Sequence, residues 1–534
     1  MQGFERPAGF DAVRVAAPGL VDPDSIFGFL EAHRADLFPP RSLDDMFADP
    51  IRGGKPSVPG PVVLAALVLQ GLLGVSDREV VERLTYDLRW KAACGVGVGE
   101  KGCFHPTVLV YWRNRIACSA RPDRIGDAVR AVIAQCGAVR GKQRRVVDST
   151  VVDDAVARQD TATLLVWQIA RIAELCPRLG NQIMGLPGGV WYRHRSKPEI
   201  DWGSKSAKDE LVSILVEDAK QVAGWVGSVA ASLDVDDPAR ARLEDEAGLM
   251  FVLAGQDVEP APGSDGTDGR WRIAERTAKD RIISIVDRET RHLRKTGKNK
   301  HDGFKAHVEV EPDTGLILAT AVSSGCGDGS SDADNGVKLL RTDPAVASGV
   351  ITQVLGDSAY DSAGFLEAAD ELKIEPVVKA RPLTVAIPGG YSLDDFTLNQ
   401  DTNTITCPAG HEATRSPKGR AKFTPWCATC PLRPSCTKAK KGRIVVIGPP
   451  QLRQREHRRR VGDPVFTATL KQHRPMVERS LAWLCRPGRR TPYRGITKTA
   501  AWWALRAAAI NLKRLLNLGL QHSQAGYWIL NPVT

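Results

Sequence analysis

The chain has 534 residues, of which 43% are hydrophobic and 25% charged, and its formal net charge is +11. This mixture is that of an ordinary globular protein, and it excludes a disordered, collagen-like or coiled-coil chain. The most apolar run, residues 62–75, is broken by Gln70 and is shorter than the roughly 20 apolar residues of a membrane span. The first 30 residues lack the pattern of a secretory signal. We therefore expect a cytoplasmic protein without a membrane partner.

The charge is distributed unevenly along the chain. Residues 413–515 hold 25 Lys and Arg against three acids, a net charge of +22, which leaves −11 for the rest. Such a concentration predicts a polyanionic partner, most simply nucleic acid. The alternative is a solvated basic face without a specific ligand. Several of these arginines lie among apolar residues rather than in a tail, which favours the nucleic-acid interpretation.

Residues 1–140 are expected to form mainly helices. Ser76 and Glu79 fit a capping box at the start of one of them. A later helix opens at residues 105–107 and carries Arg113 and Arg115. These basic residues predict a DNA-binding domain, although a plain helical bundle has the same pattern.

Strand patterns begin after residue 142. Runs rich in β-formers or alternating apolar residues lie at 146–152, 281–286, 303–310, 316–322, 351–355 and 376–378. Helical patterns cover most of residues 155–258 and recur at 332–340, 362–372, 467–484 and 497–516. The order predicts a mixed α/β sheet whose first strand is separated from the others by a helical insertion.

These patterns give a set of expected domain borders. Residues 1–140 form a helical DNA-binding domain, 141–154 the first strand, 155–270 a helical insertion, 271–384 the remaining sheet, 385–446 a Cys-rich insertion, 447–520 C-terminal helices and 521–534 a tail.

Three acids are candidates for catalysis. Asp148 is expected to end the first strand, and Asp357 directly follows the strand at 351–355. Glu478 lies near the start of an apolar helix in the most basic part of the chain. Mg²⁺ prefers carboxylate oxygens, and two such ions held by three carboxylates suit in-line phosphoryl transfer.

Each acid also has an ordinary structural explanation. Asp148 would be a turn acid, and Asp357 would cap the helix that begins near Ser362. Glu478 would pair with Arg474 or Arg479 on the same helix.

The three acids lie in blocks that together resemble the DDE transposases of bacterial insertion sequences. The blocks are Asp148-Ser-Thr, Gly356-Asp357-Ser-Ala-Tyr360 and Arg474-Pro-Met-Val-Glu478-Arg-Ser. Further similar blocks lie at residues 69–79, 87–91, 104–107, 255–260, 302–307 and 430–433, so the resemblance covers nearly the whole chain. The last block is similar to the branch with an Arg-x₃-Glu motif. The Tyr and Lys of many relatives are absent: Leu470, Lys471 and Cys485 stand at the corresponding places.

The resemblance implies a ribonuclease-H-like catalytic domain in which Asp148, Asp357 and Glu478 bind two Mg²⁺ or Mn²⁺ ions. It implies an enzyme that binds the terminal inverted repeats of a mobile element, cuts its ends and joins the 3′-hydroxyls to target DNA. The synapsis of two ends would need a homodimer on DNA. The rival interpretations are a nuclease that cuts without joining strands and a decayed or domesticated copy that only binds DNA.

Several basic residues are expected to contact DNA phosphates. Lys305 and His307 share one face of a strand, which is alternatively a solvated face. Arg294 and Lys295 belong to a basic loop between strands, and residues 453–460 and 486–494 flank the helix of Glu478. Arg474 and Arg479, which neighbour Glu478, complete the set.

The Cys-rich segment predicts a metal site. Cys407, Cys427, Cys430 and Cys436 have the spacing of tetrahedral zinc ligands, with His411 as a substitute. The resemblance supports a small zinc-ribbon-like insertion before Glu478, in which Zn²⁺ would be structural. The alternative is a cluster of reduced thiols or a degenerate site.

Overall fold

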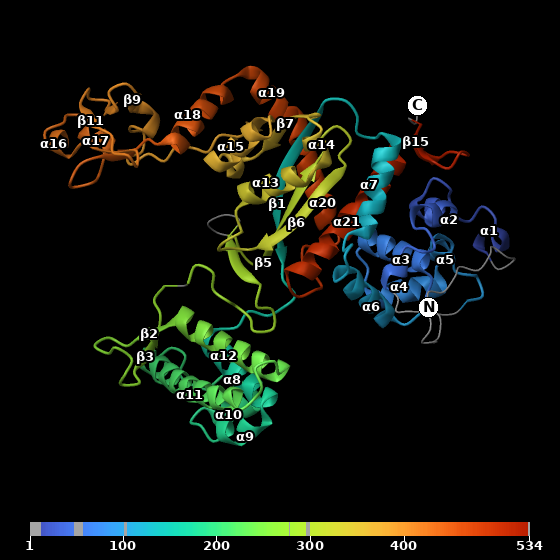
Figure 1. Ribbon diagram of the computed structural model, residues 1–534, viewed down its shortest axis with the longest axis horizontal. Coiled ribbons are helices and arrows are strands. Elements are labelled where there is room, and N and C mark those ends of the chain that lie inside the picture. Colours follow the sequence, from blue (N-terminus) through green and yellow to red (C-terminus); the bar gives the residue numbers. More distant parts are fainter. Residues whose placement is uncertain (1–11, 47–56, 101–103, 277, 295–298, 532–534) are drawn as a thin grey trace.

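The computed structural model describes residues 12–46, 57–100, 104–276, 278–294 and 299–531. A mixed sheet occupies the centre of the molecule, with the N-terminal helices on one side (Figure 1). A separate helical body follows the first strand, and a Cys-rich lobe extends from the opposite end. The predicted class, mixed α/β with a helical N-terminal region, is confirmed.

The N-terminal region is a bundle of helices around α3 (Gly60–Leu73), which is buried along almost its whole length. The other helices are α1 (Val13–Ala16), α2 (Ile26–Leu37), α4 (Asp77–Tyr86), α5 (Leu88–Cys94), α6 (Pro106–Ala117) and α7 (Arg124–Cys136). Ser76 accepts a hydrogen bond from the Glu79 N–H and caps α4 as predicted. Among the described residues no single helix is long and apolar enough to cross a membrane, although α3 and α4, bent by 113°, pass such a test as a pair.

The central sheet contains β1 (Gln143–Asp153), β4 (Arg291–Arg294), β5 (Lys300–Val310), β6 (Ile317–Ser324), β7 (Ile351–Gly356) and β8 (Glu375–Val378). Its order is β4-β5-β1-β7-β8, and β6 also pairs with β5. The strands β1, β7 and β8 are parallel, whereas β5 runs antiparallel to β1 and β6. This topology is consistent with the ribonuclease-H-like fold that the resemblance implied.

Two sequence predictions about strands are wrong. Residues 281–286 form no strand and contribute a single bridge, from Ile282 to Arg291. The expected loop after Arg291 begins as the edge strand β4. Apolar residues at 281–286 pack against the helical insertion instead, since Ile285 is buried in that core.

Apolar side chains cover both faces of the sheet. On one face Val146, Val308 and Leu355 pack against α20 (Pro475–Cys485) and α21 (Ile496–Asn517). On the other face the strands pack against α13 (Asp332–Thr342) and α15 (Ala363–Glu371). The strands are thus enclosed, and α21 continues into the N-terminal core through Leu512.

The predicted helix at 467–484 is two helices. The first, α19, spans Pro464–His473 and ends at Arg474, and α20 begins at Pro475. Proline has no N–H with which to continue the ladder of α19, so the chain breaks there. Arg474 is left at the junction of the two helices, one turn before Glu478.

Two smaller bodies are attached to the sheet. The helical insertion contains α8 (Thr161–Leu175), α9 (Pro177–Met184), α10 (Gly189–His194), α11 (Lys205–Ala231), α12 (Pro238–Asp257) and the strands β2 (Val258–Pro260) and β3 (Trp271–Ile273). The Cys-rich lobe contains β9 (Thr397–Asn399), β10 (Thr404–Thr406), β11 (Glu412–Thr414), β12 (Arg420–Lys422), α16 (Thr424–Cys427), α17 (Arg433–Cys436) and β13 (Ile444–Val446). From the lobe, α18 (Pro449–Val461) returns to the sheet, and the chain closes with a hairpin, β14 (Leu520–His522) and β15 (Trp528–Leu530).

Candidate active site

Asp148 lies in the middle of β1 rather than at its end, which corrects the sequence prediction. Its parallel pairing with β7 stops at Val146, opposite Leu355, but β1 continues to Asp153 along β5. Asp148 therefore lies just beyond the point where β7 ends. Its carboxylate accepts a hydrogen bond from the Ser149 N–H at 2.8 Å, and its side chain is 14% exposed.

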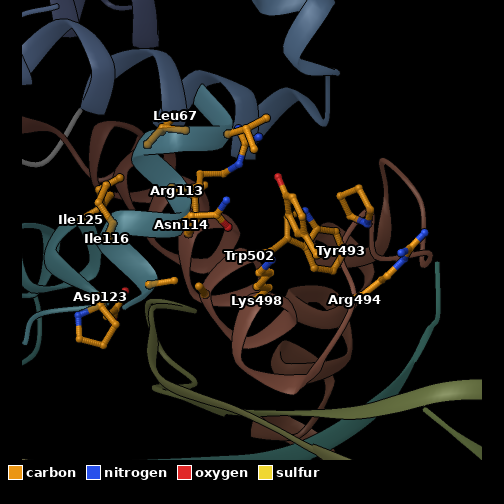
Figure 2. A pocket seen from close by; sticks show the side chains of 16 residues that line it. Leu67, Arg113, Asn114, Ile116, Asp123, Ile125, Tyr493, Arg494, Lys498 and Trp502 are labelled. Carbon is orange, nitrogen blue, oxygen red and sulfur yellow. The ribbon is translucent and has the colours of Figure 1, made fainter. Parts of the chain in front are cut away.

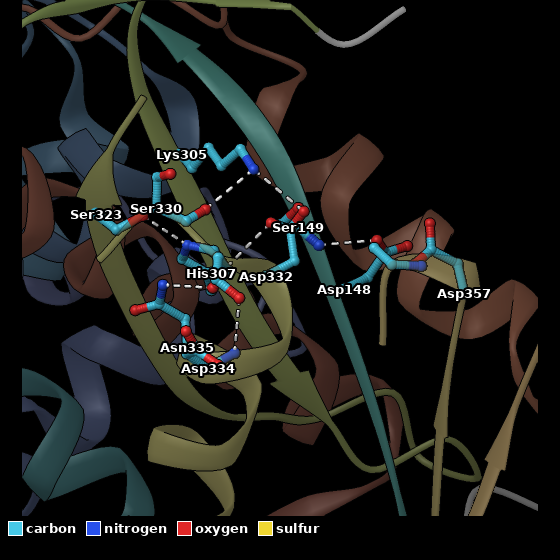
Figure 3. Close-up of polar contacts among 12 residues, drawn as sticks. Asp148, Ser149, Lys305, His307, Ser323, Ser330, Asp332, Asp334, Asn335 and Asp357 are labelled. Atoms are coloured by element: carbon cyan, nitrogen blue, oxygen red, sulfur yellow. Dashed lines mark hydrogen bonds and ion pairs between the residues drawn. The ribbon is translucent and has the colours of Figure 1, made fainter. Parts of the chain in front are cut away.

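Asp357 directly follows β7, as predicted. Its carboxylate accepts a hydrogen bond from the Ala359 N–H at 2.8 Å and caps the short 3₁₀ turn Ser358–Tyr360. The helix α15 has its own cap, Ser362. Asp357 thus does not cap α15, which removes the structural explanation considered from the sequence. Figure 3 shows Asp148 and Asp357 side by side at this edge of the sheet.

Glu478 is held next to them by the packing of α20. Val477, Leu481 and Leu484 recur at helical spacing and are buried against the sheet. Glu478 stands beside Val477 on the flank of this buried face, and its side chain is 57% exposed. Arg474 bridges the group, since its guanidinium donates to Glu478 at 2.5 Å and lies 3.4 Å from the Asp148 carboxylate.

The pKa of Asp148 responds to both of the other acids. It is raised to about 6, chiefly by burial, with the negative charges of Asp357 and Glu478 adding to the rise and the Ser149 N–H and Arg474 acting in the opposite direction. Carboxylates that disfavour one another's ionisation are stabilised by a nearby cation. Their oxygen donors are of the type that a hard divalent ion prefers, although the three residues do not all offer oxygens within 4.8 Å of one another.

A second polar cluster lies on the same stretch of sheet. Lys305, on β5, contacts Asp332 at 3.2 Å and the Ser330 carbonyl at 3.1 Å (Figure 3). His307 is fully buried, lies 2.9 Å from the Ser323 hydroxyl and 3.8 Å from Asp332. Burial lowers the pKa of His307 to about 4, so its ring is neutral at pH 7. Because His307 has no exposed surface, its predicted contact with DNA has no support in this geometry.

Asp332 is a residue that the sequence analysis missed. It begins α13, where Ser331 is the cap, and it anchors Lys305. Its negative charge also affects Tyr360. The pKa of Tyr360 lies well above its ordinary value, chiefly because of burial, and the negative charges of Asp148, Asp332 and Asp357 add to the rise. The acid at the first turn of a helix is a common stabilising pattern, so the sequence alone gave no signal for it.

The structure places the predicted DNA-contact residues in different environments. Arg113 forms an ion pair with Asp77 within the N-terminal domain, at 2.5 Å. Arg115 contacts the Tyr111 hydroxyl at the surface of α6, and Arg479 is exposed on α20. Arg294 is the last residue of β4. Lys295 lies outside the described residues.

The basic residues of α18 are largely neutralised by acids from elsewhere in the chain. The pairs join Arg453 to Asp370, Arg455 and Arg458 to Asp394, and Arg460 to Glu375. These acids precede the segment whose charge was counted, so the local net charge overstates what α18 presents to a polyanion. Residues 486–494 lie closer to the site, because the Arg489 guanidinium donates to the Thr150 hydroxyl at 2.8 Å.

The cysteines gather in one place in the lobe. Cys407, Cys427, Cys430 and Cys436 line one small cavity together with His411. The Arg443 N–H donates to the Cys427 sulfur at 3.4 Å. Burial raises the pKa of the Cys436 thiol, Arg443 lowers it, and the three other cysteines raise it again. Thiols are the ligand type that Zn²⁺ prefers, and its charge would favour the thiolates, although no three of these sulfurs lie within 4.8 Å of one another.

A separate cavity of about 380 Å³ lies between α6 and α21 (Figure 2). Tyr493 and Trp502 form part of its wall, and Arg494 and Lys498 lie at it. The Arg113 guanidinium covers the Tyr493 ring, 5.4 Å from its centroid. None of the three acids lines this cavity, which joins the N-terminal domain to the C-terminal helix.

Two segments of the chain match models of known protein families. Residues 24–115 match the family model described as "Transposase domain (DUF772)", and residues 406–516 match the one described as "Transposase DDE domain". No curated protein and no solved structure matches the chain. The second match contains Glu478 and the four cysteines, whereas Asp148 and Asp357 lie outside it. The chain therefore carries a transposase DDE domain and an N-terminal transposase domain.

Proposed function

We propose that this enzyme, a polynucleotidyl transferase by virtue of its DDE transposase domain, binds the terminal inverted repeats of a mobile element, cuts the element ends and joins the freed 3′-hydroxyls to target DNA. A transposase DDE domain implies DNA transposition and divalent metal ions. We further propose that the ions are Mg²⁺ or Mn²⁺, that two of them are bound, and that cutting is followed by joining. In a bacterial cell the reaction would take place in the cytoplasm, where the DNA is.

One observation carries this proposal. Asp148, Asp357 and Glu478 come from a strand, from the end of a neighbouring strand and from a helix more than 120 residues further along, yet Arg474 contacts both Asp148 and Glu478, and Asp357 lies beside Asp148 (Figure 3). Repelling carboxylates are costly to bring together, and a bound divalent cation offsets that cost. Arg474 beside them supplies a guanidinium suited to a phosphate.

Each group would have a separate task in the reaction. Asp148, Asp357 and Glu478 would hold the divalent ions, which lower the pKa of the attacking water or 3′-hydroxyl and neutralise the leaving oxygen. The Ser149 and Ala359 N–H groups fix the orientation of two of these carboxylates. Arg474 would turn from Glu478 towards the scissile phosphate when DNA is bound, because a phosphate offers two oxygens to its fork of donors.

Exposed cations would guide DNA to this site. Arg479 on α20 is exposed and Arg115 on α6 is partly exposed, whereas Lys305 is half-buried in its pair with Asp332. Phosphate contacts of this kind position the duplex without reading its sequence and make binding salt-dependent. A homodimer would hold two element ends together during joining. The four cysteines would hold a structural Zn²⁺ that keeps the lobe folded.

The test is cleavage of a labelled duplex that carries the element's own end, with and without Mg²⁺, by the wild type and by Glu478→Gln. Metal-dependent cutting at the end that is lost in the variant is the expected result. Transfer of the labelled strand into a second DNA is the further expected result, and cutting without transfer would identify a nuclease instead. DNA binding without cutting in Mg²⁺ or Mn²⁺ would identify a DNA-binding protein that has lost activity.

A further inference from the structure

Three potential metal ligands lie close together where α2, near the N-terminus, is next to the C-terminal hairpin. His33 and Asp36 lie on α2, and His522 ends β14 in the C-terminal hairpin. In Figure 1 this hairpin lies against the N-terminal helices, far from the strands that carry the acids. One Nδ1 or Nε2 atom of each histidine and one Asp36 oxygen all lie within 4.8 Å of one another, and among the described residues no other trio of His, Cys, Asp or Glu does so.

The distances are close to those of a tetrahedral metal site. The Nδ1 atom of His33 lies 3.1 Å from the Asp36 Oδ2 atom, and the Nδ1 atom of His522 lies 3.8 Å from the same oxygen. Zinc binds nitrogen and oxygen at about 2.0–2.2 Å, which separates tetrahedral ligand atoms by roughly 3.3–3.5 Å. The two observed separations lie on either side of this range, and the ligand nitrogens of His33 and His522 lie within 4.8 Å of each other.

Aromatic packing holds the two imidazoles in place. The Trp528 ring lies 4.6 Å from the His522 ring and 5.6 Å from the His33 ring, measured between centroids. The two histidine rings are themselves 5.2 Å apart, and Phe29 lies 5.3 Å from His33. The ligands are thus oriented by the fold, yet they are reachable from solvent, because the side chains of His33, Asp36 and His522 are 28%, 43% and 18% exposed.

The alternative is an ordinary surface ion pair. His33 is within hydrogen-bond distance of Asp36, and a neutral imidazole N–H can donate such a bond. The Nδ1 atom of His522 lies 3.8 Å from the same oxygen, too far for a hydrogen bond, so the ion pair explains only one of the two imidazoles and a shared cation would account for both. The ligand set is two nitrogens and one oxygen, which favours Zn²⁺, Co²⁺ or Ni²⁺ over the hard Mg²⁺ that an all-carboxylate site prefers.

We propose that His33, Asp36 and His522 bind a borderline divalent transition-metal ion, Zn²⁺ in the first place, with water as the fourth ligand. The ion ties the C-terminal hairpin to α2 and so closes the chain between residues 33 and 522. It thereby stabilises the contact between the N-terminal domain and the end of the catalytic region. The site is separate from the three acids and from the four cysteines, and it requires neither DNA nor catalysis.

The test uses the full-length chain, stripped with a chelator and titrated with Co²⁺. Thiolate-bound Co²⁺ gives an intense charge-transfer band in the near ultraviolet, whereas nitrogen and oxygen ligands give only weaker visible bands, so the two sites are distinguished by spectrum. We expect the wild type to bind one ion more than His522→Ala or His33→Ala, with the thiolate band unchanged in both variants. His194→Ala, which changes an exposed histidine of the insertion, is the matched control and should bind as the wild type does.

A second measurement distinguishes the loss of a bound metal ion from a variant that only destabilises the hairpin. Hydrogen exchange of residues 520–530 should slow several-fold when Zn²⁺ is added to the wild type and should not respond in His33→Ala, which leaves the hairpin sequence intact. Equal stoichiometry in the wild type and both variants, or hairpin exchange that Zn²⁺ leaves unchanged in the wild type, would overturn the proposal. Both measurements are independent of DNA cleavage, so they succeed or fail separately from the proposed transposition.

Discussion

Two clusters of charged residues on the same sheet are built alike and differ in burial. In one, Arg145 on β1 lies 2.6 Å from Asp343 and 3.1 Å from Glu309, and all three side chains are enclosed. In the other, Arg474 bridges Asp148 and Glu478, but Glu478 is 57% exposed. Each cluster places one arginine between two carboxyl groups.

The pKa directions separate the roles of these clusters. Burial raises the pKa of Glu309 well above its ordinary value, helped by neighbouring Asp343. The pKa of Asp343 is lowered, because Glu309 and Arg145 together outweigh the effect of its burial. The enclosed cluster is thus closed to water, with Arg145 paired to both carboxyl groups. Arg474 likewise contacts Asp148 and Glu478, but Asp357 lies beside Asp148 as a third acid, which leaves negative charge for an added cation. Burial thus makes one cluster structural, and exposure leaves the other free to bind.

The largest expected effect is on the open cluster. Asp148→Asn, Asp357→Asn or Glu478→Gln should lower the Mg²⁺-dependent cleavage rate by at least about 10³-fold, because each removes a charge that holds the ions. Thermal unfolding should change little, since each variant relieves repulsion. Initial rates on a labelled duplex measure the effect, and Glu456→Gln, which changes an exposed acid of the same basic region, is the control. Near-wild-type cleavage by any of the three would exclude that residue from the site.

The enclosed cluster should respond in stability rather than in chemistry. Arg145→Met leaves buried carboxyl groups without their cation and should lower the free energy of unfolding by about 3–5 kcal/mol. Denaturant unfolding measures this change. Arg341→Met removes an exposed pair with Glu371 and should cost less than about 1 kcal/mol. If the two variants were equally stable, burial would not be what distinguishes the clusters.

A smaller effect concerns His307, which lies on β5 two residues before Glu309. Its pKa falls to about 4 in the folded chain, below the ordinary value of about 6.5. Between these values the unfolded chain binds the proton and the folded chain does not. The contribution of His307 to stability is therefore complete above pH 6.5, and about 3 kcal/mol of it is lost as the pH falls to 4.

Unfolding free energies of the wild type and of His307→Gln, compared at pH 7 and pH 5, isolate this contribution. Glutamine can still bond to Ser323 but does not titrate, so the variant should lose less stability on acidification. Parallel pH profiles for the two proteins would contradict the assignment.

The smallest expected effect is on DNA affinity. Arg474→Gln should weaken binding of a duplex several-fold and reduce the slope of log affinity against log salt by about 1, because one phosphate contact is lost. Binding titrations at several salt concentrations, in Ca²⁺ or without metal to prevent cutting, measure this slope. The same slope in Arg474→Gln and the wild type would mean that this arginine serves only its two acids.

Parts of the site could be predicted from the sequence because they are local. Asp357 follows an apolar strand and lies next to a turn, and Glu478 is fixed one residue from the buried face of its helix. The break before Glu478 was missed although Pro475 causes it, since the apolar pattern runs through the proline. The position of Asp148 was wrong for a related reason: β1 continues past its pairing with β7, and only the partner strand β5 supports that extension.

Ion pairs between residues far apart in the chain could not be predicted from the sequence. The count of charges predicted a strongly basic α18, yet acids at 370, 375 and 394 neutralise much of it. Asp332 resembled any acid at a helix start until the fold placed it against Lys305. The trio of His33, Asp36 and His522 spans almost the whole chain, so spacing gave no sign of it.

By itself the sequence determined which segments become strands and helices and which acids follow them, because hydrophobic periodicity, capping residues and prolines act within a few residues. Only the tertiary structure decided which charges meet and how far each is exposed to water. Coulomb interactions and desolvation depend on distance and burial, which are set by the packing of segments far apart in the chain. The same residue types therefore give a closed structural cluster at Arg145 and an open one at Arg474.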